Sequence, residues 1–370
     1  MAERVRVGLI GCGAISAAYL KMARNLPILD IAACADLDGD KARARAEEFG
    51  IPRVLGVDEL IADPDVEVVL NLTIPQAHAS VAIAALEAGK HTFSEKPLGI
   101  RREEGAGVLR TGAARGLRVG CAPDTVLGAG IQTARKAIDD GLIGRPIGFT
   151  AHMLSRGVET WHPNPRFYYE VGGGPMFDMG PYYLTALLNL LGPIRRISAL
   201  TSIAIPVRHI TSQPFAGQDV EVETPDHLCG SIEFRDGAIG TLMTSFATAH
   251  GVYDRKMPIV VYGTDGTLKV PDPNGFDGPV QVRGLKDEDW VDVPHAFPTG
   301  YGRAVGLADL CHAVRSGREH RCSAEQAFAV LDAMQAFLES SDCGRAVSLE
   351  SEYERPKPMA VGLPFGQLDD

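Results

Sequence analysis

Short β-like runs alternate with helical runs over the first 122 residues, and this rhythm constrains the fold most strongly. Residues 5–10 predict a strand, and residues 66–72 are apolar enough for a strand that is covered on both faces. A helix is predicted from Pro75, which suits its first position, to Gly89, which suits the position just past its end. Alternation of this kind, with covered strands, predicts a parallel, doubly wound sheet.

After residue 121 the pattern changes to alternating strands separated by turns, such as the Asp236-Gly237 dipeptide that hairpins favour. A helix is predicted over 175–191 and a loop over 207–224. The predicted strands of this half are 147–154, 194–205, 227–234, 238–246, 258–262 and 266–270. This half therefore predicts an α+β fold on an open, mostly antiparallel sheet.

The chain has 370 residues, which is enough for two domains with large buried cores. We expect a nucleotide-binding Rossmann domain over 1–122 and a domain for substrate binding and oligomerisation over 123–370. The net charge is −11, from 36 Lys and Arg against 47 Asp and Glu. A chain this acidic lacks the basic footprint of a protein that binds nucleic acid or an anionic membrane. No apolar run approaches the ~20 residues of a membrane helix.

The seven cysteines are scattered and contain no Cys-x-x-Cys pair. Such usage is typical of reduced thiols and argues against a disulfide framework or a zinc site. The first predicted strand begins at residue 5, which leaves no room for a signal peptide. The sequence therefore predicts a cytoplasmic protein without a metal.

A glycine-rich turn follows the first predicted strand and opens the first helix. Its residues are Gly11, Cys12, Gly13, Ala14, Ile15 and Ser16. Gly11 permits the tight turn, and Gly13 lets a pyrophosphate approach the backbone at the positive end of the helix. Ser16 replaces the third glycine of the full fingerprint, and the same pattern also fits a simple strand–helix turn.

Asp36 ends the second predicted strand, twenty-five residues after Gly11. A carboxylate there accepts hydrogen bonds from the adenosine-ribose hydroxyls of a dinucleotide. It also repels a 2′-phosphate, and Leu37, not an arginine, follows it, so NAD is favoured over NADP. The alternative is a solvated loop carboxylate or a helix cap.

Lys96 stands between Glu95 and Pro97 at the carboxyl edge of the predicted sheet, where doubly wound folds bind ligands. Proline fixes the local backbone, and this dipeptide permits a cis bond. A lysine there can hydrogen-bond a substrate hydroxyl and lower the pKa of a neighbouring acid. The alternative is an ordinary surface lysine.

Asp178 and Tyr182 follow a glycine run at 172–174 and stand four residues apart, on one face of the predicted helix. Beside a lysine they form an acid/base set for an alcohol proton. A phenol with a pKa of about 10 in water becomes a usable base only if a cation such as Lys96 stabilises its phenolate. The alternatives are a helix-start carboxylate and a packing tyrosine.

The proline-rich segment 159–166 lies just before this glycine run. Trp161 offers a stacking face for a sugar ring, and His162 or Arg166 can hydrogen-bond the hydroxyls of that ring. The same residues fit a proline-braced surface loop with a packed tryptophan, so both interpretations stay open.

Five motifs in this order and spacing resemble the Gfo/Idh/MocA oxidoreductases over residues 3 to about 192. They are Gly-Cys-Gly-x-Ile-Ser from Gly11, Thr73-Ile74-Pro75-x-x-His78, Ala88-Gly89-Lys90-His91, Glu95-Lys96-Pro97, and Gly-Gly-Gly followed by Asp178-x-Gly180-x-Tyr182. The resemblance implies a Rossmann domain followed by an open sheet that builds a homodimer or homotetramer. It also implies hydride transfer between a sugar or polyol carbon and the nicotinamide, without a metal.

The resemblance assigns roles to individual residues. The catalytic set is Lys96, Asp178 and Tyr182; many relatives have histidine at the last position, and others have tyrosine. Cofactor contacts are expected from the glycine turn, Asp36, Thr73, Pro75, His78, Glu95 and Lys96. Asp124 and Thr125 stand near the domain junction, where many relatives have Asn or Arg, and they are expected to join Lys96, Trp161, His162, Arg166, Asp178 and Tyr182 at the substrate.

The sequence thus predicts an NAD-dependent dehydrogenase that oxidises a secondary or anomeric hydroxyl of a sugar, cyclitol, polyol or glycoside. Two alternatives remain open. One is a redox-initiated enzyme that cleaves a glycosidic bond and keeps its NAD bound. The other is a regulator that senses a sugar or NAD without catalysis, although such a protein has no chemical need for Lys96, Asp178 and Tyr182 together.

Overall fold

The computed structural model describes residues 3–369, which form two compact units. The first unit contains the described residues up to 132, 295–331 and those from 356 onward; the second contains 133–294 and 332–355. These units differ from the predicted segments 1–122 and 123–370, because two stretches of the C-terminal half pack with the first unit.

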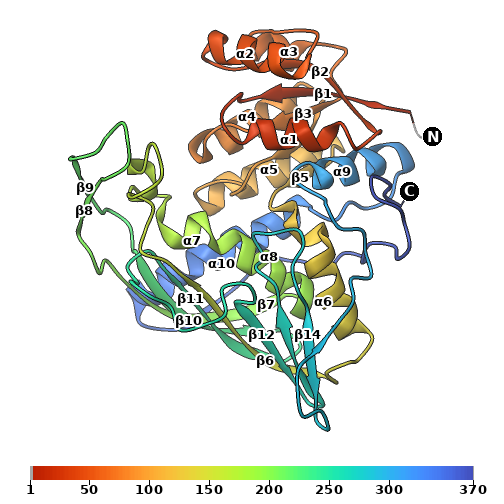
Figure 1. The fold of residues 1–370 in the computed structure, drawn as a ribbon. Helices are drawn as coiled ribbons and strands as arrows, with labels where there is room; N and C mark the ends of the chain where they lie inside the picture. Colours follow the sequence, from red (N-terminus) through yellow and green to blue (C-terminus); the bar gives the residue numbers. More distant parts are fainter. Residues whose placement is uncertain (1–2, 370) are drawn as a thin grey trace. The chain divides into compact units, whose positions relative to one another are not determined.

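The first unit is built on a five-stranded parallel sheet in the order β2-β1-β3-β4-β5. The strands are β1 (Val5–Ile10), β2 (Leu29–Ala35), β3 (Val68–Asn71), β4 (His91–Ser94) and β5 (Val119–Cys121). The helices of this unit are α1 (Ser16–Ala23), α2 (Gly39–Phe49), α3 (Val57–Ala62), α4 (Pro75–Glu87), α5 (Arg102–Arg115) and α9 (Val305–Ser316) (Figure 1). The sheet confirms the predicted doubly wound fold, and α3 is a helix that the sequence reasoning missed.

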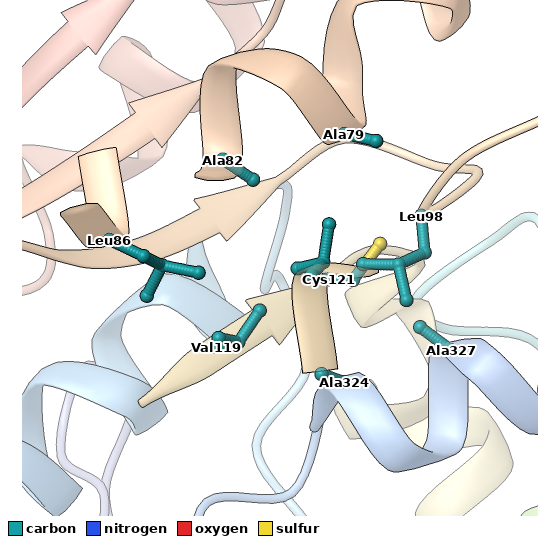
Figure 2. Packing of buried hydrophobic residues seen from close by; sticks show 9 residues of the cluster. Ala79, Ala82, Leu86, Leu98, Val119, Cys121, Ala324 and Ala327 are labelled. Atoms are coloured by element: carbon teal, nitrogen blue, oxygen red, sulfur yellow. The ribbon is translucent and has the colours of Figure 1, made fainter. Parts of the chain in front are cut away.

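A patch of small and aliphatic side chains explains why C-terminal residues join the first unit (Figure 2). Ala324 and Ala327, at the start of α10 (Ala324–Cys343), pack in one cluster with residues of α4 and β5. The other labelled members are Ala79, Ala82, Leu86, Leu98, Val119 and Cys121. The division between the units falls inside α10, after Leu331.

The second unit is built on a nine-stranded sheet in the order β15-β14-β13-β12-β6-β11-β10-β7-β16. Its strands are β6 (Pro146–Leu154), β7 (Ile194–Ser202), β10 (His227–Phe234), β11 (Ile239–Ser245), β12 (Ile259–Gly263), β13 (Gly266–Val270), β14 (Gln281–Gly284), β15 (Val291–Asp292) and β16 (Val347–Ser348). All the pairs are antiparallel except β6 with β11. The mostly antiparallel sheet is as predicted, and the Asp236-Gly237 turn joins β10 to β11.

Three local predictions are corrected here. The predicted loop 207–224 contains a hairpin of β8 (Val207–His209) and β9 (Asp219–Glu221). The predicted helix 175–191 is two helices, α7 (Gly174–Asp178) and α8 (Gly180–Leu191), because Pro181 has no N–H with which to continue the helical ladder. A single helix is predicted over 125–140, but the structure has a 3₁₀ turn, η1 (Asp124–Leu127), followed by α6 (Ala129–Asp139).

The two faces of the second sheet differ. One face is buried under helices: a Cβ on Gly230 of β10 would stand 2.6 Å from the ring of Phe337 in α10. The other face exposes the large apolar side chains of Leu200, Ile239 and Tyr262. Within residues 3–369, no helix combines the length and apolar character needed to cross a bilayer.

Candidate functional site

The carboxyl ends of four neighbouring strands in the first unit carry the predicted cofactor residues. Gly11 follows β1, Asp36 follows β2, Thr73 comes two residues after β3, and Lys96 comes two residues after β4. Since the strand order is β2-β1-β3-β4, these residues lie in the order Asp36, Gly11, Thr73, Lys96 along one edge. This is the edge at which doubly wound sheets bind their ligands.

The glycine turn after β1 has the backbone geometry that a dinucleotide site needs. Gly11 has φ +97°, and a Cβ there would stand 2.5 Å from the Leu72 carbonyl oxygen, so only glycine fits. Gly13 is exposed, and a Cβ on it would meet nothing within 4 Å. No side chain caps the start of α1, so the positive end of this helix, at the glycine turn, can face an anion.

Asp36 links the end of β2 to the glycine turn. Its carboxylate accepts hydrogen bonds from the backbone N–H of Cys12 at 2.7 Å and of Asp38 at 2.9 Å. Two exposed apolar side chains follow the strands nearby: Leu37, which is 97% exposed, and Ile74. A half-buried carboxylate flanked by exposed apolar surface suits a ribose with an attached base.

Glu95 holds the turn that carries Lys96 against α1. Its carboxylate accepts a hydrogen bond from the Tyr19 hydroxyl at 2.8 Å and another from the Lys96 backbone N–H at 3.0 Å. Burial, and the charge of Glu95, raise the pKa of Tyr19. The Lys96–Pro97 peptide bond is cis, as the dipeptide permits. Because the Glu95 carboxylate is buried and accepts the Lys96 N–H, it restrains the backbone of Lys96.

His78 holds the same turn from the other side. Its Nδ1 lies 2.7 Å from the Pro97 carbonyl oxygen and its Nε2 lies 3.0 Å from that of Thr73. The ring is buried, and this burial lowers the pKa of His78. His78 therefore connects the turn after β3 to the turn after β4.

Asp124 and Thr125 lie in the interior of the first unit. The Asp124 carboxylate accepts hydrogen bonds from the backbone N–H groups of Ala304 at 2.9 Å and Gly306 at 3.2 Å, and Arg303 lies 3.6 Å away. Burial raises the pKa of Asp124. Both side chains are fully buried, in contrast to the expectation that they face a substrate, and Asp124 instead holds the start of α9.

A cavity of about 320 Å³ lies within the second unit, and three predicted residues line it together. Asp178 ends α7, Tyr182 lies in the first turn of α8, and Trp161 comes from the proline-rich segment. Asp178 and Tyr182 thus line the same cavity although they belong to two different helices. The other lining residues are Met153, Ser155, Gly157, Val158, Tyr168, Met179, Phe246 and Asn274, none of which was predicted.

Aromatic rings form one wall of this cavity. Tyr168 lies 6.4 Å from Phe246, measured between ring centroids, and the His162 ring lies 5.0 Å from Tyr168 and 5.5 Å from Trp161. His162 itself is not among the lining residues, and its Nδ1 lies 2.8 Å from the Asn164 carbonyl oxygen. It contacts the rings of the wall without bordering the cavity.

Arg166 does not line the cavity either. Its guanidinium donates a hydrogen bond to Gln218 Oε1 at 2.6 Å. The structure thus brings Trp161, Asp178 and Tyr182 together and places Arg166 elsewhere. Sequence reasoning missed Tyr168 and Asn274 because no local pattern separates them from other loop residues.

The parallel sheet, the glycine turn and the carboxylate that follows β2 together define an oxidoreductase-type Rossmann domain. Comparison with protein families gives the same result: residues 5–122 match the oxidoreductase family with an NAD-binding Rossmann fold. Residues 131–269 match the Gfo/Idh/MocA C-terminal domain. The chain belongs to the Gfo/Idh/MocA family of oxidoreductases, as its motifs indicated.

Curated relatives span most of the chain. D-xylose dehydrogenase of Paenarthrobacter nicotinovorans is 25% identical, covering 79% of this chain and 80% of the relative. Levoglucosan dehydrogenase of Pseudarthrobacter phenanthrenivorans is 28% identical, covering 72% of this chain and 73% of the relative. Myo-inositol 2-dehydrogenase of Thermotoga maritima is 26% identical over 71% and 74%.

The similarity to solved structures concerns the fold. Levoglucosan dehydrogenase in its apo form has a TM-score of 0.82 at 24% identity, covering 95% of this chain and all of the other. Its complex with NADH and L-sorbose has a TM-score of 0.81 at 24% identity, covering 94% and 99%.

Proposed function

We propose that the protein is an NAD-dependent dehydrogenase that oxidises a hydroxyl-bearing carbon of a small neutral sugar or polyol. The observation that carries this proposal is the cavity of the second unit, where Asp178 and Tyr182 line the same space as an aromatic wall. The names of the relatives, which include xylose, levoglucosan and inositol dehydrogenases, support the same substrate class.

The edge of the first unit fits the cofactor. Backbone N–H groups at the start of α1 would hold the pyrophosphate, and Asp36 would hold the adenosine ribose. Leu37 and Ile74 offer exposed apolar surface for the adenine. NAD, when bound, accepts the hydride that leaves the substrate carbon.

Asp36 supports NAD over NADP, because its carboxylate would lie against the 2′-phosphate and repel it. Asp36→Ala is expected to weaken NAD binding about tenfold, which corresponds to the loss of roughly one charge-assisted hydrogen bond. The variant should also reduce the difference in affinity between NAD and NADP. Titration of both cofactors against the wild type and the variant measures this. An unaltered ratio of the two dissociation constants would refute the role of Asp36.

Lys96, Asp178 and Tyr182 supply the proton chemistry of the proposal. Tyr182 takes the proton of the reacting hydroxyl while the C–H hydrogen leaves as hydride, so the alcohol becomes a carbonyl. Lys96 donates a hydrogen bond to that hydroxyl and stabilises the tyrosine's phenolate. Asp178 accepts a hydrogen bond from a substrate hydroxyl and fixes its orientation.

The size and charge of the cavity favour one uncharged sugar ring. A volume of about 320 Å³ stands at the small end of the range of roughly 300–1,000 Å³ that ligand pockets have. Among the described residues that line it, Asp178 is the only charged one. In the proposed site Lys96 is already engaged with the reacting hydroxyl and the tyrosine phenolate, so a phosphate or a carboxylate buried beside Asp178 would have no cation of its own to pair with.

The test is NADH absorbance with purified protein, NAD and a panel of compounds. The panel contains aldoses, inositols, anhydro sugars, glycosides, sugar phosphates and a nucleotide-linked sugar. We expect NADH with a subset of the neutral compounds, and a fall of about 10³-fold in turnover in Lys96→Ala with NAD binding retained. Lys136→Ala, which removes a surface lysine paired with Asp140, is the matched control.

Two results would contradict the proposal. No NADH with any compound, although NAD binds, would favour the glycoside-cleaving enzyme or the regulator. Cleavage of a glycoside without net NADH would identify the first of these. Turnover of the sugar phosphates alone would support a dehydrogenase activity but contradict the proposal that the substrate is neutral.

The open face of the second sheet supports a homodimer or homotetramer. Leu200 is 74% exposed, and Ile239 and Tyr262 are exposed on the same sheet. Apolar side chains grouped on one sheet face are typical of a surface that a partner covers. Leu200→Lys is expected to shift the mass measured by light scattering toward the monomer; a wild type that is already monomeric would reject this surface.

A further inference from the structure

A buried charge cluster lies behind the aromatic wall of the cavity in the second unit. It consists of Glu159, Tyr169, Arg208 and Asp226, all of them within the interior; Arg208 is 2% exposed and Asp226 is fully buried. Arg208 comes from β8, in the segment that sequence reasoning took for a loop. Ionised side chains are rarely buried to this degree without a role that fixes them there.

The Arg208 guanidinium ties two carboxylates together. It donates hydrogen bonds to Glu159 Oε1 at 3.2 Å and to Asp226 Oδ2 at 2.7 Å. It also donates to the Arg156 carbonyl oxygen at 2.9 Å. The planar fork of arginine reaches these acceptors in different directions, which a lysine ammonium on its single flexible stem does less well.

Tyr169 completes the cluster. Its hydroxyl donates a hydrogen bond to Glu159 Oε2, and the Arg208 guanidinium lies 5.3 Å from the centre of its ring. Backbone N–H groups of Ala204 and Ile205 donate to Asp226 at 2.6 and 3.2 Å. The two carboxylates are thus paired with one guanidinium, one phenol and backbone donors.

The cluster contacts the residues that line the cavity. The Val158 N–H donates to the Tyr169 hydroxyl at 3.2 Å, and the Phe246 N–H donates to the Asp226 carbonyl oxygen at 2.8 Å. A Cβ on Gly157 would stand 2.6 Å from the Tyr169 hydroxyl, so the glycine leaves room for the cluster.

Two more lining residues depend on this contact. The Trp161 N–H donates to the Val158 carbonyl oxygen at 3.2 Å, and Tyr168 is the chain neighbour of Tyr169. The aromatic wall is therefore joined to the cluster through Tyr169 and Asp226, and Arg208 is the residue that ties the carboxylates of this cluster together.

We propose that Arg208 is a positioning residue of the substrate site, which fixes the aromatic wall and so sets the affinity for the sugar without touching it. This inference rests on the proposed function, in which the cavity holds the substrate. If Arg208 served the fold alone, its loss would lower thermal stability and leave the wall and the Michaelis constant as they are.

The experiment compares Arg208→Lys and Tyr169→Phe with a matched control, Arg196→Lys. Arg196 pairs with Glu233 on the same unit, but its side chain is 55% exposed. Tyr169→Phe removes a single hydroxyl and keeps the ring, so it tests the cluster even where Arg208→Lys fails to fold. All the proteins are measured below the onset of their own thermal unfolding.

Fluorescence anisotropy of Trp161 reports on the wall directly. The chain has two tryptophans, so a Trp290→Phe background leaves Trp161 as the sole emitter. We expect both cluster variants to lower the Trp161 anisotropy, and Arg196→Lys to leave it unchanged. An unchanged anisotropy in a folded cluster variant would overturn the role of Arg208, whether or not the wild type turns over a sugar.

Steady-state kinetics test the consequence for the substrate. We expect Arg208→Lys to raise the KM for the sugar at least tenfold and Tyr169→Phe about threefold, with kcat and the dissociation constant of NAD within about twofold of the wild type. A KM that stays constant while anisotropy falls would reject the effect on substrate affinity. A wild type that makes no NADH with any compound would instead refute the proposed function.

Discussion

The cofactor edge of the first unit and the cavity of the second unit are built in different ways. At the edge, each predicted residue lies within two residues of the end of a strand, and the backbone around Gly11 and Gly13 is the surface proposed to hold the cofactor. The cavity is made of side chains that come from positions as far apart as Met153 and Asn274. A binding surface made by backbone at strand ends is visible as a short motif, whereas one made by distant side chains is not.

The largest effect that tests this comparison is expected at the cavity. Tyr182→Phe removes the proposed base and should lower kcat by about 10²–10⁴-fold, the usual contribution of a positioned acid or base. Its chain neighbour Tyr183 donates a hydrogen bond to the His152 carbonyl oxygen and does not line the cavity. Tyr183→Phe is therefore the control, and steady-state kinetics should show a large loss of kcat in Tyr182→Phe only. Equal losses of kcat in the two variants would mean that the substitutions act through the packing of α8 and not through the phenol of Tyr182.

At the edge, two glycines separate the needs of the fold from those of the cofactor. Gly11→Ala places a Cβ against Leu72 at a positive φ, and should lower the free energy of unfolding by at least about 2 kcal/mol. Gly13→Ala meets open space and should leave stability within about 0.5 kcal/mol while weakening NAD binding about tenfold.

Urea unfolding and NAD titration of the two variants measure these effects. If Gly13→Ala binds NAD as well as the wild type, the open space above Gly13 is not where the cofactor lies. If Gly11→Ala unfolds like the wild type, the turn does not require glycine.

The smallest expected effect is on the stability of the protein at acid pH. Burial lowers the pKa of His78, His91 and His320 in the first unit, and of His152 in the second. The unfolded chain binds a proton near pH 6.5, while the folded chain binds one only at lower pH. These histidines therefore leave the free energy of unfolding unchanged above about pH 6.5 and lower it as the pH falls below that value.

His320→Gln should remove part of this acid sensitivity. His320 Nε2 lies 2.9 Å from the Val119 carbonyl oxygen, and a glutamine amide can donate the same hydrogen bond without titrating. The variant should lose less stability than the wild type between pH 6.5 and 5.5, by up to about 1 kcal/mol. His209→Gln, at an exposed position on β8, is the control in urea unfolding at each pH.

Sequence reasoning found the residues whose chemistry is unusual for their local setting. Gly11, Asp36 and Lys96 each follow a strand in a short, distinctive motif, and the structure places them along one edge. Trp161 and Tyr182 were found in the same way and line one cavity. Asp124 was predicted to lie at the substrate, and nothing in its local sequence shows that Ala304 and Gly306, at the start of α9 some 180 residues later, donate to its carboxylate.

The family, the parallel sheet and the residues at its edge could be predicted from the sequence, because strand periodicity, glycine turns and capping depend on neighbours within a few positions. Three features could not be predicted in this way: α10 begins in the first unit, Tyr168 and Phe246 lie in one wall, and Arg208 belongs to the cluster next to that wall. Those contacts join residues far apart in the chain, where burial and charge pairing, not local preference, select the partner.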